Sequence, residues 1–137
     1  MASIKEVAQK AGVGVGTVSR VLNSTGYVSD ETRIKVETAM KELNYIPNEL
    51  ARNLLSKKSG IVAIIIPKIS HPFFAEVVLY AEAELMKKGY KTMICSTYSE
   101  QNYEKEYINM LNRHIVDGII AGSQMLDFEE YQGVQGP

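Results

Sequence analysis

The apolar residues of this chain change their spacing abruptly near residue 60, and this change limits the available folds more than any other feature. Up to Leu55 they recur mostly three or four residues apart, as in helices with one buried face. From Ile61 to Ile66 the chain is continuously apolar and mostly β-branched, which is typical of a strand buried on both faces of a parallel sheet. A basic, small-residue stretch at 57–60 separates the two patterns. The sequence therefore predicts an all-α N-terminal domain followed by an α/β domain.

The second part of the chain alternates strand patterns with helix patterns. Strands are predicted at 61–66, 91–96 and 116–121, and a helix at 100–113. The helix after the first strand should end at Gly89, and its apolar side comprises Phe73, Phe74, Val77, Val78, Ala81 and Leu85. This alternation implies right-handed crossovers and a doubly wound α/β sheet. The sheet is predicted to be partial, because three strands do not complete such a domain and residues 122–137 are polar and glycine-rich toward their end.

Three helices are predicted within the first 45 residues. Ser3 and Glu6 have the spacing of a capping box at the start of the first helix, and Gly12 ends it because glycine readily adopts a positive φ angle. The third helix should begin at Ser29 and end near Asn44. Its predicted apolar stripe is Ile34, Val36, Ala39, Met40 and Leu43. The short connection between the first two helices is typical of a helix-turn-helix, although a generic three-helix bundle fits the spacing equally well.

The polarity of the second helix favours DNA binding over a generic bundle. This helix exposes small polar groups and Arg20 and has almost no acid, as a helix that enters a major groove should. Residues 1–58 hold nine Lys/Arg and six Asp/Glu, whereas residues 59–137 hold six and ten, so the net charges are +3 and −4. A balance of +3 is common, but the asymmetry is consistent with a basic module that faces a polyanion, joined to an acidic module.

A fourth helical segment, Asn48–Ser56, follows Pro47 and differs from the other three. At about nine residues it should be marginal in isolation. Leu54 and Leu55 adjoin its end, where a purely solvated linker would not need large apolar side chains. The predicted organisation is a helix-turn-helix domain at 1–46, a hinge helix and linker at 47–59, and an incomplete α/β subdomain at 60–137.

Several classes of function are excluded by the residues that the sequence lacks. No apolar run reaches the roughly eighteen residues of a membrane span, and the N-terminus lacks the layout of a secretory signal, so we expect a cytoplasmic, nucleoid-associated protein with no membrane partner. His71 and His114 have no neighbouring metal-ligand residues, and Cys95 lies in an apolar strand where burial makes it inert. The glycines of 12–16 lack the context of a phosphate-binding loop. No enzymatic activity, cofactor or metal is expected.

The order of motifs resembles the LacI family of bacterial transcription regulators. Residues 3–13 and 17–23 match its N-terminal signature, and shorter motifs at 28–29, 31–33, 43–45, 47–48 and 51–52 continue it in register. The motifs at 65–67, 72–74 and 116–119 resemble the start of the family's periplasmic-binding-protein-like core. The match is most specific in the first 58 residues. Family members are considerably longer, so the resemblance implies a chain truncated in its effector-binding core.

The resemblance implies that the second helix reads DNA in the major groove. Val15, Gly16 and Arg20 would face base edges, with Arg20 either forming a bidentate contact to guanine or contacting a phosphate. Val15 and Gly16 offer only apolar contact. Gly14 replaces the family's usual serine, which removes a hydroxyl near the phosphate. The phosphate-positioning residues implied are Thr17, Ser19, Asn23 and Ser29, and the DNA-binding set is completed by Ser3, Asn48, Ala51 and Leu54.

Leu54 matches the leucine that paired hinge helices of this family insert into the minor groove. A marginal hinge helix would then fold only together with DNA and the partner hinge. The role of Leu55 stays open.

The family's core binds a sugar or another small metabolite between two subdomains. By resemblance Phe73 and Phe74 border that cleft, although a plain core position fits one of them equally well. Ser96 is a further effector-binding candidate, and Thr97, Gly122 and Ser123 are weaker ones. The implied dimer surface is Val77, Tyr80, Ala81 and Glu84.

The resulting expectation is a homodimeric regulator, acting as a repressor on a roughly palindromic double-stranded DNA operator in response to a sugar or small metabolite. Two alternatives remain from the sequence. One is a small-molecule-binding protein akin to periplasmic sugar receptors. The other is a truncated fragment that binds DNA weakly because its dimer surface is incomplete.

Overall fold

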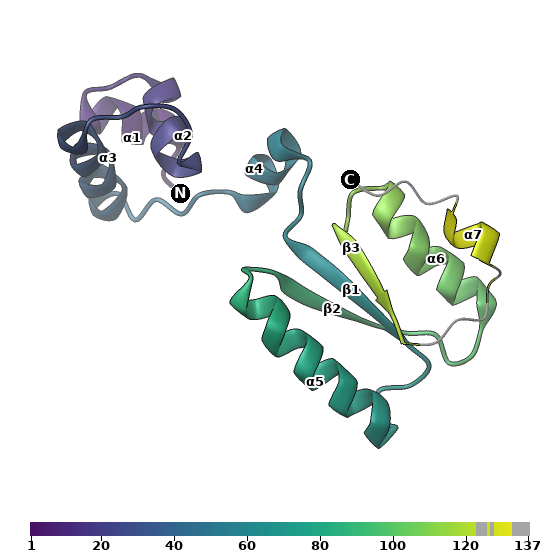
Figure 1. Cartoon of the computed structure of the whole chain (residues 1–137). Helices are drawn as coiled ribbons and strands as arrows, with labels where there is room; N and C mark the ends of the chain where they lie inside the picture. Colours follow the sequence, from purple (N-terminus) through teal and green to yellow (C-terminus); the bar gives the residue numbers. More distant parts are fainter. Residues whose placement is uncertain (123–125, 127, 133–137) are drawn as a thin grey trace. The chain divides into compact units, whose positions relative to one another are not determined.

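The computed structural model of the chain divides into two compact units, Met1–Arg52 and Asn53–Pro137 (Figure 1). It describes residues 1–122, 126 and 128–132. Each unit contains hydrophobic core residues of its own. The division falls inside helix α4 (Glu49–Ser56).

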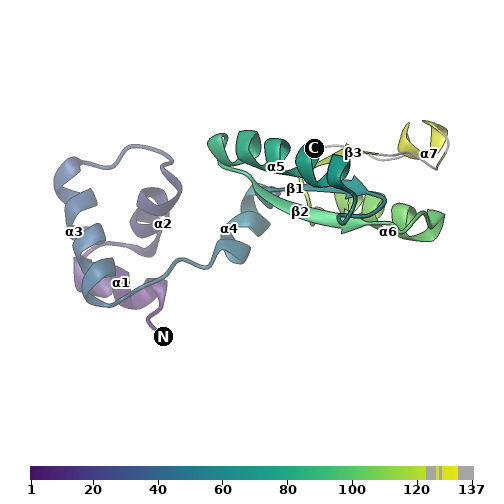
Figure 2. The ribbon, with the colours of Figure 1, turned by 90° about the horizontal axis from the view of Figure 1, so that it is seen from below.

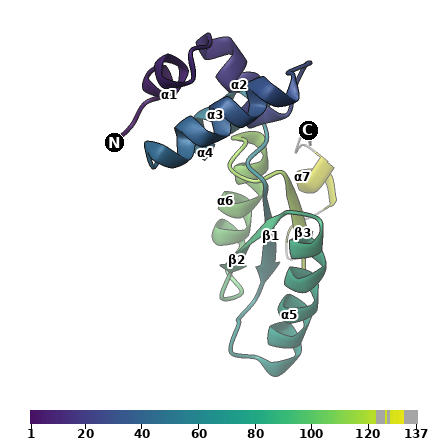
Figure 3. The same ribbon diagram turned by 90° about the vertical axis from the view of Figure 1, so that its left-hand side faces the viewer.

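The first unit contains three packed helices, α1 (Ile4–Ala11), α2 (Val15–Asn23) and α3 (Asp30–Glu42). Figure 3 shows them from a second direction. Their buried side chains form one cluster, which comprises Val7, Ala8, Val18, Val21, Val36 and Ala39. Gly12, with a φ of 67°, ends α1 and turns the chain into α2. The helix-turn-helix prediction is therefore confirmed.

Side-chain caps and left-handed residues account for the ends of α1 and α3. The Ser29 hydroxyl accepts a hydrogen bond from the Thr32 amide at 3.3 Å at the start of α3. Asn44, with a φ of 48°, turns the chain after α3 as predicted. The predicted apolar stripe of α3 is wrong at Ile34, which is 61% exposed, whereas Val36 is fully buried. Residues two apart on a helix point in directions that differ by roughly 200°, so these two cannot share a face.

The second unit is organised around a parallel sheet with the strand order β2-β1-β3. The strands are β1 (Ile61–Ile66), β2 (Lys91–Ser96) and β3 (Gly118–Ala121). In the middle strand Ala63 and Ile65 are buried in one cluster, and Ile64 and Ile66 are buried in another. Successive side chains of a strand point to opposite faces, which is why a continuous apolar run suits this position.

Two helices cover the opposite faces of this sheet (Figure 2). Helix α5 (Pro72–Lys87) packs Val78 against the Ile64 and Ile66 side, and α6 (Gln101–Asn112) packs Ile108 against the other side. This arrangement confirms the prediction of a partial doubly wound α/β subdomain. The predicted bounds of β1 and β2 agree with the observed ones, whereas those of α5 and α6 differ by one or two residues and β3 begins at Gly118 rather than at 116.

A short helix, α7 (Phe128–Gln132), follows β3. Its Tyr131 hydroxyl donates a hydrogen bond to the buried carboxylate of Glu104 in α6. Burial, together with this bond and the charge of Glu104, raises the pKa of Tyr131 well above its usual range. This hydrogen bond holds α7 against α6.

The described residues provide no helix that is both long enough and apolar enough to cross a membrane. Within the same part of the chain, no group of three or more His, Cys, Asp and Glu side chains is placed to hold a metal ion. Cys95 is buried in β2, and desolvation raises the pKa of its thiol.

Candidate nucleic-acid interface

Helix α2 buries one side and exposes the other. Val18 and Val21 are buried in the core of the first unit. Val15 is 42% exposed, and Gly16 and Arg20 are also exposed. The three residues predicted to read base edges therefore lie at the solvent-facing surface of a helix whose other side is fixed by packing.

Arg20 lies close to two glycines that leave room for its long side chain. A Cβ atom built on Gly26 would stand 3.2 Å from the Arg20 Cδ, and one built on Gly16 would stand 3.9 Å from its Nη2. Gly26 also has a φ of 67°, a conformation that other residues adopt at a cost. The guanidinium group is thus positioned by the shape of its surroundings and remains exposed.

The predicted phosphate-positioning residues are all half-buried. The Asn23 amide donates a hydrogen bond to the Ser19 hydroxyl at 3.2 Å within α2. The Ser29 hydroxyl donates to the Thr32 hydroxyl at 2.9 Å while it caps α3. Ser29 therefore has a structural role in addition to the one predicted for it.

The N-terminal ends of α2 and α3 border one shallow hollow. Gly14, Thr17, Tyr27, Ser29 and Thr32 are among the residues that line it. Gly14 caps α2 without a side-chain hydrogen bond, because glycine has no side-chain acceptor. The partial positive charge of two helix N-termini favours an anion such as a phosphate at this place.

The hydroxyl of Ser3 is part of a capping box. It donates to the Glu6 carboxylate at 2.8 Å and accepts from the Glu6 amide at 3.3 Å, while the Ser3 amide donates to the same carboxylate at 2.7 Å. The backbone bond and then the hydroxyl bond lower the pKa of Glu6. The structure gives Ser3 this capping role, and its contact with DNA stays a prediction.

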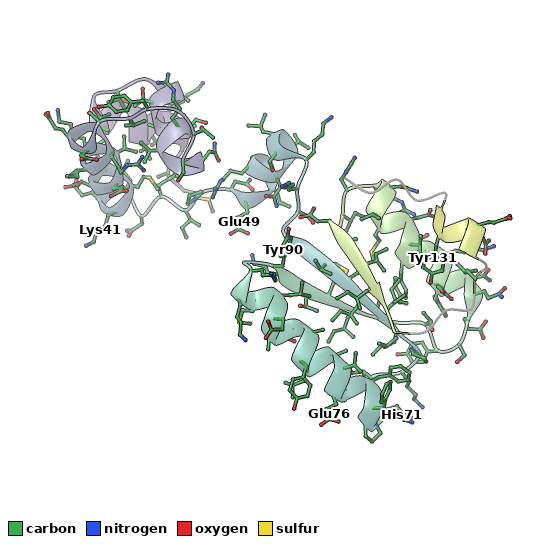
Figure 4. The ribbon with its side chains drawn as sticks, viewed as in Figure 1. Lys41, Glu49, His71, Glu76, Tyr90 and Tyr131 are labelled. Atoms are coloured by element: carbon green, nitrogen blue, oxygen red, sulfur yellow. The ribbon has the colours of Figure 1, made fainter. Side chains whose placement is uncertain are left out.

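Helix α4 buries none of its side chains. The side-chain oxygen Oδ1 of Asn48 accepts hydrogen bonds from the backbone amides of Leu50 and Ala51 at 3.0 and 3.4 Å, and so stabilises the first turn. Leu54 and Leu55 are both 82% exposed, and Leu50 is 80% exposed. Glu49, labelled in Figure 4, marks the start of this helix.

Sequence reasoning assigned no site role to Arg52, although it lies within the first unit and contacts α2. Its Nε donates to the Asn23 side-chain oxygen at 3.0 Å, and its Nη2 donates to the Leu22 carbonyl at 3.2 Å. A cation at the C-terminal end of a helix is favoured by the helix dipole. No local sequence signal predicts this contact, because the partners are about thirty residues apart.

The effector candidates gather at the carboxyl end of the sheet in the second unit. Phe74 is half-buried against Ile64, Ile66 and Val78, whereas Phe73 is 61% exposed and so is wrongly placed on the buried side of the predicted helix. The Phe rings form an edge contact with centroids 5.1 Å apart. Figure 4 shows His71 at the start of α5, where its ring nitrogen accepts from the Phe73 amide at 3.3 Å.

The remaining effector candidates follow β2 and β3. Ser96 ends β2 and its carbonyl accepts from the Tyr107 hydroxyl at 3.0 Å. Thr97 is fully buried, and its amide donates to the Ile66 carbonyl at 2.9 Å. A Cβ on Gly122 would stand 3.2 Å from the Ile65 carbonyl oxygen, so the chain passes close to the end of β1. Ser123 lies outside the described residues.

The predicted dimer surface lies on α5. Tyr80 is 67% exposed, Val77 and Ala81 are half-buried, and Glu84 forms an exposed ion pair with Lys87 at 2.6 Å. Sequence reasoning missed two further exposed apolar residues of this helix, Leu79 at 63% and Met86 at 67%. They were missed because they lie off the single apolar side that helical spacing defines.

Comparisons with known proteins cover both units of the chain. Residues 3–48 match a family described as bacterial regulatory proteins of the lacI family, and residues 59–135 match periplasmic binding proteins and the sugar binding domain of the LacI family. The sucrose operon repressor of Streptococcus mutans and the ribose operon repressor of Bacillus subtilis are each 44% identical over the whole chain. The chain spans 43% and 42% of the length of these two relatives.

Solved structures of longer proteins share the fold of the chain. A lac repressor dimer bound to operator and an anti-inducer matches 97% of the chain with a TM-score of 0.80 and 31% identity, and the match covers 40% of that chain. A LacI-family transcriptional regulator from Silicibacter pomeroyi matches 95% of the chain with a TM-score of 0.74 and 31% identity, over 39% of its own length.

Proposed function

The chain belongs to the LacI family of bacterial regulatory proteins, and on that premise we propose that it is a sequence-specific DNA-binding repressor of transcription. It acts as a homodimer on a roughly palindromic operator. It acts in the cytoplasm, where the bacterial chromosome lies. The observation that carries this proposal is the exposed side of α2, where Arg20 is seated between Gly16 and Gly26 on a helix with a packed opposite side.

Base reading in the major groove depends mainly on Arg20. Its exposed guanidinium provides the donor pair that matches O6 and N7 of guanine. Val15 and Gly16 beside it offer no hydrogen bonds and are suited to a thymine methyl group. The specificity of α2 is therefore concentrated in one polar side chain.

Phosphate contacts place α2 in the groove. The hollow between the N-termini of α2 and α3 accepts one phosphate, and Thr17 and Ser29 lie at its lining. Ser19 and Asn23 form the second group of phosphate contacts, with Ser3, Asn48 and Ala51 completing the set. These contacts fix register and carry no sequence information of their own.

The hinge helix adds a contact in the minor groove. Leu54 is 82% exposed in the free chain, and insertion between base steps would bury it. Two hinge helices meet at the operator's centre, each supplying one leucine. Residues 1–46 then serve as the major-groove module, 47–59 as the hinge, and 60–137 as part of the module for dimerisation and effector binding.

Dimerisation and effector binding use the second unit. Tyr80 on α5, which is 67% exposed, supports a dimer surface around Val77, Ala81 and Glu84. The effector is a sugar or small metabolite, in keeping with relatives named as sucrose and ribose operon repressors. It binds at the carboxyl end of the sheet near Phe73, Phe74 and Ser96, where ligands of open α/β sheets bind.

Selection of binding sites from random DNA duplexes tests this function. The chain should enrich a roughly palindromic sequence with a guanine in each half-site. Arg20→Lys should reduce affinity for that sequence about tenfold or more and relax the preference at the guanine position, because lysine cannot form the planar bidentate contact. Arg113→Lys, an exposed arginine of the second unit, is the matched control. If the selection enriches no sequence, the proposal is overturned.

A further inference from the structure

The carboxylate of Asp117, just before β3, binds the linker that precedes β1. One oxygen accepts from the Ser59 amide at 2.7 Å and from the Ser59 hydroxyl at 3.1 Å. The other oxygen accepts from the Gly60 amide at 2.9 Å. All three residues are half-buried. Two successive backbone donors thus meet the two oxygens of one carboxylate, a set that an amide side chain with a single acceptor oxygen cannot satisfy.

Ser59 is also hydrogen-bonded to the C-terminal part of α4, which belongs to the second unit. The Asn53 side-chain amide donates to the Ser59 carbonyl at 3.2 Å. The Asp117 backbone is itself held by the sheet, because its amide donates to the Ile61 carbonyl at 2.8 Å. We refer to Asn53, Ser59, Gly60 and Asp117 as the linker clamp. It connects the last turns of α4 to the start of β3.

The bonds to Ser59 are not needed to complete the sheet. β1 begins at Ile61, and it already pairs with β2 from Ile61 and with β3 from Val62. The Asp117 bonds therefore order Ser59, which lies just before the ladder and whose hydroxyl also accepts from the Ile61 amide at 3.2 Å. Gly60 is already joined to β2, because its carbonyl accepts from the Lys91 amide at 2.8 Å. Hydrogen bonds to a carboxylate are about twice as strong as neutral ones, so they can hold a linker that would otherwise be flexible. Ordering the linker in advance lowers the entropy lost on binding.

We propose that Asp117 is a positioning residue for operator recognition, which holds the linker so that the end of α4 is fixed to the sheet before DNA binds. The inference rests on the proposed function, because it assigns the clamp a part in specific DNA binding. Asp117 acts through Ser59 and Asn53 and touches no DNA itself. Loss of the clamp should weaken binding that requires an ordered hinge and should leave binding through α2 and the phosphates unchanged.

Asp117→Asn in the whole chain tests the proposal. The asparagine keeps one acceptor oxygen and loses the second, so Ser59 or Gly60 is left without its partner. Affinity for the selected operator should fall about tenfold, while affinity for a duplex of unrelated sequence at the same salt concentration should not change. Glu106→Gln is the matched control, because it removes one negative charge from an exposed ion pair with Arg113 and does not touch the linker.

A double-mutant cycle with Asn53→Ala separates positioning from a general loss of stability. Both residues act on Ser59, so the double variant should lose no more operator affinity than the weaker-binding single variant. Additive losses, or an unchanged ratio of operator to unrelated-duplex affinity in Asp117→Asn, would overturn the positioning role. If Asp117→Asn does not fold, Ser59→Ala removes one of the three bonds to Asp117, together with the bond that the Ser59 hydroxyl accepts from the Ile61 amide at 3.2 Å. It should shift the same ratio by about two- to threefold, and an unchanged ratio there also overturns the positioning role.

Failure of the proposed function is distinguishable from failure of the clamp. If the unchanged chain prefers no operator, the proposed function fails and the positioning role fails with it. If the unchanged chain prefers an operator and Asp117→Asn keeps that preference in full, only the positioning role fails. Amide hydrogen exchange at Ser59 and Gly60 provides a readout without DNA, and Asp117→Asn should accelerate it about tenfold. Unchanged exchange would show that the carboxylate does not hold the linker.

Discussion

Helices α2 and α4 are almost equal in length, nine and eight residues, and both carry residues proposed to contact DNA. They are stabilised in different ways. α2 buries Val18 and Val21 in the core of the first unit, whereas α4 buries no side chain. Helices this short are marginal in water without tertiary packing. The helix proposed to read bases is thus fixed by packing within the first unit, whereas the helix proposed to insert a leucine has no buried side chain to stabilise it.

The exposed side chains of the two helices also differ in their polarity. α2 presents one arginine and small side chains, but α4 presents Leu50, Leu54 and Leu55, each at least 80% exposed. Three exposed leucines on one short helix form a surface that a monomeric protein rarely leaves in water. Burial of these leucines is therefore expected on DNA, where it would add stability to a helix whose end is held by the linker clamp.

The largest effect expected is on the free energy of unfolding. It is tested by placing an aspartate at one position of α2 and at one position of α4. Val18→Asp places a carboxylate in a fully buried site and should unfold the first unit, at a cost of several kcal/mol. Leu54→Asp at an 82% exposed site should change the free energy of unfolding by at most about 0.5 kcal/mol. Thermal unfolding followed by circular dichroism measures both. Similar losses in the two variants would mean that α4 is packed as firmly as α2.

The next effect concerns DNA affinity. Leu54→Ala should weaken operator binding about ten- to hundredfold, because burial of a leucine in the minor groove contributes roughly 1.5–3 kcal/mol. Binding to unrelated duplex should stay the same. Ile34→Ala is the control, since Ile34 is an apolar residue of the first unit that is 61% exposed and has no proposed contact with DNA. Gel-shift titrations at one salt concentration measure both variants, and an equal fall in specific and non-specific binding would contradict the insertion of Leu54.

A smaller effect, on the stability of the first unit, tests whether α2 is formed before DNA binds. Gly14→Ser should stabilise the first unit by a few tenths of a kcal/mol and tighten binding to any duplex, because serine caps a helix and adds a hydroxyl near the phosphate. A Cβ at Gly14 meets no atom within 4 Å, and its φ of −74° suits serine. Gly12→Ser is the control with a φ of 67°, and it should destabilise by about 1 kcal/mol or more. Loss of stability in Gly14→Ser would contradict the cap.

The smallest effect is on the pH dependence of stability. The capping box of α1 should make the stability of the first unit, which includes α2, depend on pH, whereas the stability of α4 should not. Hydrogen bonds from Ser3 hold the pKa of Glu6 below its ordinary value of 4.5. The stabilisation is therefore fully present above pH 4.5 and is lost as the pH falls through the lower pKa of the folded state. Glu6→Gln should flatten the acid side of the stability curve of the first unit. An acid limb that is identical in the variant would exclude the capping box as its source.

The parts predicted from the sequence are those with a local physical cause. The run from Ile61 to Ile66 predicted a strand buried on both faces, because only a strand covered on both faces can bury successive apolar side chains. Gly12 and Asn44 predicted helix ends because they adopt left-handed conformations at low cost. The generic three-helix bundle was the competing interpretation, and the turn geometry around Gly12 favours the helix-turn-helix.

The parts that the sequence did not predict depend on contacts between distant residues or on the exact rotation of a helix. The bond from Arg52 to Asn23 joins residues 29 apart, and that from Ser59 to Asp117 joins residues 58 apart. No spacing rule covers either. Ile34 and Phe73 were wrongly assigned to buried sides because an apolar residue type was taken as sufficient for a core position. About half of a folded protein's surface is apolar, so residue type alone does not decide burial.

The two glycines beside Arg20 have unequal consequences for how the DNA specificity of this protein can evolve. At Gly26 a new Cβ would stand 3.2 Å from the Arg20 Cδ and the backbone has a positive φ, so a substitution there would displace Arg20 and strain the backbone. At Gly16 the nearest atom is 3.9 Å away and the backbone is helical, so alanine fits there and favours the helix by about 1 kcal/mol. Gly16→Ala would therefore change the surface that is proposed to face the bases while making the protein more stable. A regulator with such a position can acquire a new target sequence without first losing its fold.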